Sequence, residues 1–272
     1  MKRYIIFIIL LGILEISLAL YLTEWRHIFW NFVEQKNFHG FCVQIGVFTG
    51  IALLFCIVTA FSSYFTSLCS IKWREVLTKR ANTTKNISNI ENFSQRVQQD
   101  CMDYPWLMLN ILFGLGKAAA YILVFSVSLY VNFSGTYLTA IVIYAILSTC
   151  VARKIAKPLI SLNYKVQVAE ATYRNDLSLL NFGSCISLMR GLAVKTKHLN
   201  YFQTFYGQLA VVLPIMIVAP AYFHGALTLG AMMQATSTMG TISDNCSYGI
   251  YNFSTINQLL SCKRRLKEIN VI

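Results

Sequence analysis

Glu15 is the residue whose position most strongly suggests chemistry, because it lies within an apolar run from Tyr4 to Leu22. The hydrocarbon layer of a membrane is about 30 Å thick, and a helix needs roughly 20 apolar residues to cross it. An ionised carboxylate is costly at that depth, so it usually has a function or a partner there. Loss of solvation favours the neutral form, so Glu15 is a candidate for taking up and releasing a proton. The alternative is a structural role between packed helices.

A second charge, Lys117, follows Gly114-Leu115-Gly116 inside another apolar run. Its ammonium group could pair with Glu15 if the two residues lie at similar depth, and pairing would weaken the idea of a proton carrier. More commonly such a lysine extends its chain so that the charged end reaches the membrane surface. Both interpretations stay open at this point.

The last hydrophobic segment is unusually polar for a membrane span. A helix that faces lipid would not tolerate so many hydrogen-bonding groups. We therefore expect this segment to line a water-filled path or to face a second copy of the chain, with Gln234 and Asp244 as candidate pathway residues. The alternative is hydrogen bonding within the helix bundle. The polar residues are Gln234, Thr236, Ser237, Thr238, Thr241, Ser243, Asp244, Asn245, Ser247 and Asn252.

Composition places the chain in the membrane. It is 56% hydrophobic and 12% charged, with a mean hydropathy of +0.54, whereas soluble domains carry about 25% charged residues. The net charge of +12 is typical of basic cytoplasmic segments, and we expect no nucleic acid partner. The eight cysteines include no Cys-x-x-Cys pair and have no histidine at metal-ligand spacing, so neither a disulfide framework nor a zinc site is expected. We also expect no cofactor and no enzymatic activity.

The elements that must position these residues are six apolar helices in one membrane domain, residues 1–272. Pro105 is suited to the first turn of a helix and marks the entry to the third span. The two long stretches between spans, 72–103 and 153–197, are expected to be helical continuations. The predicted spans cover residues 4–22, 41–64, 107–131, 136–152, 205–223 and 228–257.

Lysines and arginines predict the orientation. They gather at both termini and in the stretches 72–103 and 153–197. The connections at 23–40, 132–135 and 224–227 are short and carry few of them. Because positive residues favour the cytoplasmic side, both termini are expected in the cytoplasm.

Five short segments give a more specific indication. They are Glu15–Leu18 with the region of Trp25, then Lys72–Thr78, Asn92–Asp100, Glu170–Leu177 and Ala219–Gln234. In type and order they resemble elements of the SbmA/BacA-like peptide-uptake transporters and of related ABC transporters of the peroxisomal fatty-acyl (ABCD) type. This resemblance extends over nearly the whole chain.

The resemblance implies an all-α fold, the six-helix transmembrane domain of a type IV ABC exporter with long cytoplasmic helical extensions. It also implies a homodimer in a lipid bilayer, a peptide-like substrate and coupling to a proton gradient, in a bacterial inner membrane. The Arg96–Asp100 and Glu170–Arg174 pairs, each one helical turn apart, are either surface contacts or gate contacts. The residues that match family elements in structural or gating roles are Trp73, Arg74, Gln95, Arg96, Asp100, Glu170, Arg174 and Gly230.

Two departures from the ABC relatives affect the expected energy source. The segment Ser184–Gly191 lacks the glutamate with which those relatives dock their ATPase, and no Gly-x-x-x-x-Gly-Lys-Ser/Thr phosphate loop occurs. We therefore expect a proton-driven transporter of peptides or similar amphipathic solutes. The alternatives are a permease subunit whose ATPase is a separate chain, and a membrane scaffold that transports nothing.

Overall fold

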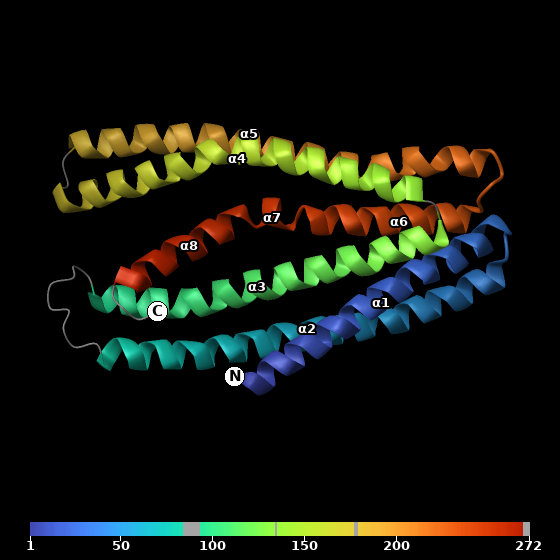
Figure 1. Ribbon diagram of the computed structural model, residues 1–272, viewed down its shortest axis with the longest axis horizontal. Coiled ribbons are helices and arrows are strands. Elements are labelled where there is room, and N and C mark those ends of the chain that lie inside the picture. Colours follow the sequence, from blue (N-terminus) through green and yellow to red (C-terminus); the bar gives the residue numbers. More distant parts are fainter. Residues whose placement is uncertain (84–92, 134, 177–178, 269–272) are drawn as a thin grey trace.

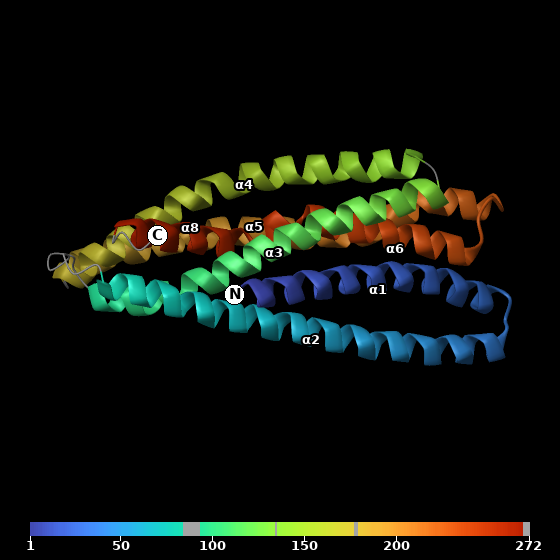
Figure 2. The ribbon, with the colours of Figure 1, turned by 60° about the horizontal axis from the view of Figure 1, so that its bottom comes forward.

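The computed structural model describes residues 1–83, 93–133, 135–176 and 179–268, and the regular structure in these ranges is α-helical. Long helices run side by side along one axis of an elongated molecule (Figures 1 and 2). The helices are α1 (Lys2–Glu34), α2 (Phe38–Thr83), α3 (Phe93–Asn132), α4 (Gly135–Asp176), α5 (Leu179–Phe223), α6 (Leu229–Cys246), α7 (Tyr248–Tyr251) and α8 (Phe253–Glu268).

Helix α1 continues well beyond the predicted first span, so the connection expected over 23–40 shrinks to residues 35–37. Aromatic packing between α1 and α2 explains the extension. Trp25 packs on Phe48 at 4.8 Å between ring centroids and Phe29 packs on Phe41 at 5.2 Å. The Trp25 indole also donates a hydrogen bond to the Gln44 carbonyl. The polar residues of this stretch therefore lie on a helix and not in a loop.

The turn between α1 and α2 is compact. Lys36 adopts a left-handed φ of 54°, and the Asn37 side chain accepts a hydrogen bond from the backbone N–H of Gly40 at 3.0 Å, as a residue that caps a helix start does. The ring of Phe32 lies against Gly40 so closely that a side chain at that position would collide with it. This turn fixes α1 and α2 as an antiparallel pair.

Where the structure describes them, over residues 72–83, 93–103, 153–176 and 179–197, the stretches beyond the apolar spans are helical, as the sequence predicted. The rest of these stretches lies outside the described residues. Helix α2 has 46 residues and α5 has 45. At 1.5 Å per residue, each is close to 70 Å long, about twice what the hydrocarbon layer requires. The prediction that Pro105 begins a helix is wrong, because it lies inside α3. Its ring is fully buried, and packing of the helix around it offsets the missing backbone donor.

Within the described residues, four helices are long and apolar enough to cross a membrane: α1, α2, and the segments Val97–Asn132 of α3 and Phe182–Phe223 of α5. Helix α4 contributes a shorter apolar segment, Gly135–Leu147. Helix α6 is too polar to qualify by hydropathy. It packs against α1, α3, α4 and α5, so much of its surface lies against protein.

The sixth predicted helix, 228–257, begins where the sequence placed it, but its helical conformation is interrupted at Ser247 and Asn252. The side chains there compete for backbone carbonyls: Ser247 donates to the Ser243 carbonyl at 2.8 Å and Asn252 to that of Tyr248 at 2.9 Å. Backbone hydrogen bonds still cross both breaks, so α6, α7 and α8 form one interrupted helix. Figure 1 shows its change of direction at α7.

The helices form two groups with α6 between them. Helices α1 and α2 pack on each other and on α3, while α4 and α5 form a second antiparallel pair (Figure 1). The turns that join α1 to α2 and α5 to α6 lie at the same end of the molecule. The main apolar core joins α3, α4, α5 and α6 through Phe125, Leu129, Ile141, Val218, Met239 and Ile242.

Candidate functional site

Glu15 and Lys117 form an ion pair between α1 and α3. The Lys117 Nζ lies 2.6 Å from Glu15 Oε2, and the side chains are 28% and 14% exposed, respectively. The lysine does not extend along its own helix toward a membrane surface. The structure thus joins the two intramembrane charges that the sequence singled out, and pairing offsets much of the cost of burying each of them.

Three helices meet at this pair. Lys117 also lies 3.5 Å from the Ser62 hydroxyl on α2, and Ser62 is buried. The lysine side chain passes over Gly12, where a Cβ atom would lie 3.5 Å from the lysine Cε.

A second polar contact joins α1 to α6 nearer the short turns. The Gln234 side chain is buried and donates to Glu24 Oε2 at 2.7 Å, and Arg26 donates to the Ser237 hydroxyl. Asn31 accepts from the backbone N–H of Gly230 at 3.0 Å. We call this set the α1–α6 seam. Gln234 therefore has a partner within the bundle, as the hydrogen-bonding alternative requires.

The start of α6 is held by acceptors from two sources. Thr228 caps the helix by accepting from the Ala231 N–H at 3.2 Å, and Glu34 accepts from the Leu229 N–H at 3.0 Å. A carboxylate at a helix N-terminus also interacts favourably with the helix dipole. Gly230 lets the two helices meet, because a Cβ there would collide with the His27 carbonyl and the Asn31 amide.

The deeper polar residues of α6 divide into two kinds. Ser243 and Ser247 are buried, and both contact the Tyr206 hydroxyl of α5, at 3.0 and 2.9 Å. Thr238 is also buried and donates to the Gln234 carbonyl. Asp244 differs, because its side chain is exposed. Among the side chains that the structure describes, none makes a hydrogen bond or ion pair with the Asp244 carboxylate.

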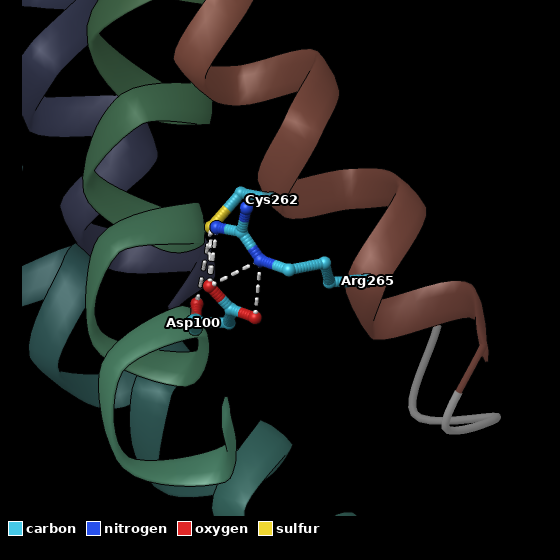
Figure 3. A network of polar contacts seen from close by, with 3 residues as sticks. All are labelled: Asp100, Cys262 and Arg265. Atoms are coloured by element: carbon cyan, nitrogen blue, oxygen red, sulfur yellow. Dashed lines mark hydrogen bonds and ion pairs between the residues drawn. The ribbon is translucent and has the colours of Figure 1, made fainter. Parts of the chain in front are cut away.

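The opposite end of the bundle holds a third polar contact, between α3 and α8 (Figure 3). Arg265 binds Asp100 with two nitrogens, Nη2 to Oδ1 at 2.7 Å and Nε to Oδ2 at 2.9 Å. The Asp100 side chain is only 3% exposed. The Cys262 thiol lies 3.3 Å from Asp100 Oδ1. We call these three residues the α3–α8 clasp.

Burial and the neighbouring carboxylate make the clasp thiol a poor nucleophile. Desolvation, with the negative charge of Asp100, raises the pKa of Cys262 to about 12. The hydrogen bonds and charge of Asp100 raise the pKa of Arg265, so the arginine stays ionised. Thiol chemistry needs the thiolate, so Cys262 serves packing and not reaction.

An apolar cluster supports the clasp. Leu77, Cys101, Tyr104 and Leu266 are buried in it, and Trp73 packs edge-on against Tyr104 at 5.7 Å. Trp73 therefore has a structural contact, and the charge of its neighbour Arg74 reaches the buried Cys101. Other predicted positions lie outside the described side chains: Gln95, Arg96, Glu170 and Arg174.

Sequence reasoning did not find three of the residues in these contacts. Arg265 was part of a basic C-terminal run, and Glu24 and Glu34 were assigned to a loop. The spacing of Glu24, Asn31 and Glu34, seven residues and then three, places them along one side of a helix. This spacing could have predicted that the stretch is helical. Their partners on α6 come from about 200 residues away, and no local pattern indicates them.

Long apolar helices, with paired charges within them and a polar helix at their centre, define a multi-pass integral membrane protein. The chain belongs to the SbmA/BacA-like family, which matches residues 4–272. That family is related to the membrane portions of ABC transporters.

Two relatives that are 24% identical to this chain show the relation to ABC transporters. The chain is 24% identical to the inner membrane ABC transporter ATP-binding protein YddA of Escherichia coli (strain K12), over 98% of this chain and 56% of that protein. It is 24% identical to ABC transporter D family member 2, chloroplastic, of Arabidopsis thaliana, over 76% of this chain and 34% of that protein. The chain thus spans about half or less of the length of these relatives.

Proposed function

We propose that this chain is a proton-driven membrane transporter of peptides or similar amphipathic solutes. It acts as a homodimer in a bacterial inner membrane, with both termini in the cytoplasm. The observation that carries the proposal is the placement of a carboxylate and its counter-charge, Glu15 and Lys117, within the apolar parts of α1 and α3. Pairing counts against Glu15 as a lone proton carrier, but it makes the contact between α1 and α3 depend on the charge of Glu15.

The pair offers a way to couple a proton to helix movement. While Glu15 is ionised, its attraction to Lys117 holds α1 against α3. Protonation from the side with the higher proton concentration cancels that attraction and leaves the lysine to Ser62 and water. Loss of the proton on the other side restores the pair. Binding and release of one proton thus switch the protein between two conformations, one with α1 held against α3 and one with this contact released, as a transporter needs.

The second candidate is a permease subunit energised by a separate ATPase chain. The Escherichia coli relative favours it, since that protein is named an ABC transporter ATP-binding protein. In that case the α3–α8 clasp would transmit ATPase movements to α3, since α8 is joined to α6 through the short helix α7 and Arg265 binds Asp100 with two nitrogens.

Transport in liposomes separates the two candidates. The purified protein is reconstituted and a pH gradient, acidic outside, is imposed without ATP. The proton-driven function predicts accumulation of a labelled amphipathic test peptide, and collapse of that accumulation by a protonophore. Accumulation that requires an added ATPase and ATP supports the permease, and a bound but never transported peptide contradicts both candidates.

A further inference from the structure

The surroundings of Asp244 contain groups from four helices. Asp244 belongs to α6, Tyr251 to α7, Tyr144 to α4 and Tyr206 to α5. Asp244 directly follows Ser243, whose hydroxyl lies 3.0 Å from that of Tyr206. Tyr144 stacks on Tyr206, and the Tyr251 hydroxyl lies beside Gly207, the residue after Tyr206. These four residues, which we call the Asp244 cluster, meet near the break that divides α6 from α7.

The aromatic part of the cluster is built rigidly. The rings of Tyr144 and Tyr206 stack, with centroids 4.9 Å apart and planes 9° from parallel. Tyr144 donates to the Tyr206 carbonyl at 3.0 Å, and the Tyr206 hydroxyl is held by Ser243 and Ser247. Packing and hydrogen bonds therefore fix two of the three rings before any ligand arrives.

The remaining members of the cluster are open to the surroundings. Tyr251 is 46% exposed, and its hydroxyl lies beside α5, where a Cβ on Gly207 would approach it to 3.6 Å. Asp244 is exposed as well. The seam and the clasp bind their carboxylates to cationic or amide groups, but the described side chains make no such bond with Asp244.

The position of Asp244 makes this arrangement informative. Helix α6 packs against α1, α3, α4 and α5, so Asp244 lies on a helix that is surrounded by other helices. An ionised carboxylate in such a bundle is costly unless it faces water or a cation. An accessible carboxylate beside aromatic rings suits an organic cation, which gains both a charge-assisted hydrogen bond and cation–π attraction.

We propose that the Asp244 cluster is the subsite that binds a cationic group, an ammonium or guanidinium, of the transported solute. This inference rests on the proposed function and adds to it the chemistry of one recognised group. Asp244 supplies the charge, Tyr251 the accessible ring, and the Tyr144–Tyr206 stack the fixed wall. The Glu15–Lys117 pair, on α1 and α3, is a separate element of the machinery.

Binding to two matched peptides tests the subsite without a proton gradient. Tetra-arginine amide and tetra-citrulline amide have nearly the same shape but differ in charge. The full chain is placed in nanodiscs of zwitterionic lipid, and calorimetry measures the affinity for each peptide, with empty nanodiscs as the baseline. We expect the arginine peptide to bind at least about tenfold more tightly, as a charge-assisted hydrogen bond allows.

Substitutions test whether the preference for the arginine peptide over the citrulline peptide depends on the Asp244 cluster. Asp244→Asn should remove it while the citrulline affinity stays the same, and Asp244→Glu should retain it. Tyr251→Leu should reduce it several-fold and covers the case in which Asp244→Asn does not fold. The control is Glu75→Gln, which removes an exposed carboxylate bound only by neighbouring lysines on its own helix and should leave the preference unchanged.

Equal affinity of the wild-type protein for the two peptides, or an unchanged preference in both Asp244→Asn and Tyr251→Leu, overturns the subsite. A loss of preference in Glu75→Gln equal to that in Asp244→Asn overturns it too, because the effect would then be general electrostatics. Failure of the proposed function gives a different result from failure of the subsite. In that case the nanodisc protein still prefers the arginine peptide, but the liposomes accumulate no peptide under a pH gradient.

Discussion

At position 15, a proton-coupled transporter needs a carboxyl group and not only a hydrogen-bond acceptor. Glu15→Gln keeps the size of the side chain and an acceptor for Lys117, but it cannot ionise. We expect this variant to lose gradient-driven uptake in liposomes, and Glu15→Asp to retain part of it because the carboxyl moves by only about one methylene. Normal uptake by Glu15→Gln would make Glu15 a structural residue.

The same variant also affects stability, since it leaves the Lys117 ammonium without its counter-charge. Breaking a buried ion pair costs about 3–5 kcal/mol, whereas removal of both partners is often tolerated. Glu15→Gln should therefore lower the thermal midpoint of unfolding in detergent, and Glu15→Gln with Lys117→Met should restore most of it. The exposed Glu75→Gln serves as the control in both measurements. A double variant no more stable than Glu15→Gln alone would contradict the pairing.

Cys262 supplies a prediction that depends on pH. Its pKa is raised to about 12 in the folded chain, from an ordinary value of 9.0. Above pH 9 the unfolded chain releases the thiol proton and the folded chain does not, so the contribution of Cys262 is complete below pH 9 and is lost as the pH rises toward 12. The stability advantage of wild type over Cys262→Ser, measured by thermal unfolding, should fall between pH 8 and pH 10.5. A constant difference would show that the thiol ionises as easily in the clasp as in water.

At the scale of helices, the fit between α1 and α6 depends on one glycine. Gly230→Ala places a methyl group against the His27 carbonyl and the Asn31 amide, so the helices must separate. Overpacking of this kind costs about 1–3 kcal/mol. The measurement is the thermal midpoint of unfolding in detergent, which we expect to fall.

Gly240 provides the matched control, because it lies in the same helix and a Cβ there would meet no atom within 4 Å. Gly240→Ala should leave the protein as stable as before or raise its stability by up to about 1 kcal/mol, since alanine favours the helix. Equal effects of the two substitutions would show that close contact at Gly230 is unimportant.

The sequence predicted the helices better than their ends. Apolar runs located the membrane-crossing parts of α1, α2, α3 and α5, because the bilayer sets a length that the chain must meet. The extension of α1 through Trp25 was not predictable from composition, since tertiary contacts with Phe48 and Gln44 stabilise it. The breaks between α6, α7 and α8 have local causes, in Ser247 and Asn252. The sequence analysis interpreted the polar residues of this segment as lining a pathway and did not predict that they would interrupt the helix.

In the candidate site too, the sequence predicted individual residues but not the contacts that depend on tertiary packing. Glu15, Lys117 and Asp244 were identified from charge in an apolar setting, which a single sequence displays. Their partners depend on which helices pack together, so the Glu15–Lys117 contact was one of two open interpretations until the fold was known. Glu24 and Arg265 were missed because their partners, Gln234 and Asp100, lie far away in the chain.

At the scale of the whole molecule, the prediction concerns which end faces which side of the membrane. The α1–α2 turn and the far end of α2 lie at opposite ends of the molecule (Figure 1). Basic residues gather toward the far end, so that end should face the cytoplasm.

Single cysteines at Lys36 and Lys79, both exposed, are introduced into a cysteine-free chain in intact cells. A membrane-impermeant maleimide should label position 36 without permeabilisation and position 79 only after it. Labelling of position 79 in intact cells would reverse the orientation, and the direction in which Glu15 receives its proton would reverse with it. Labelling of both positions in intact cells would remove the long extension of α2 from the cytoplasm and contradict the six-span topology itself.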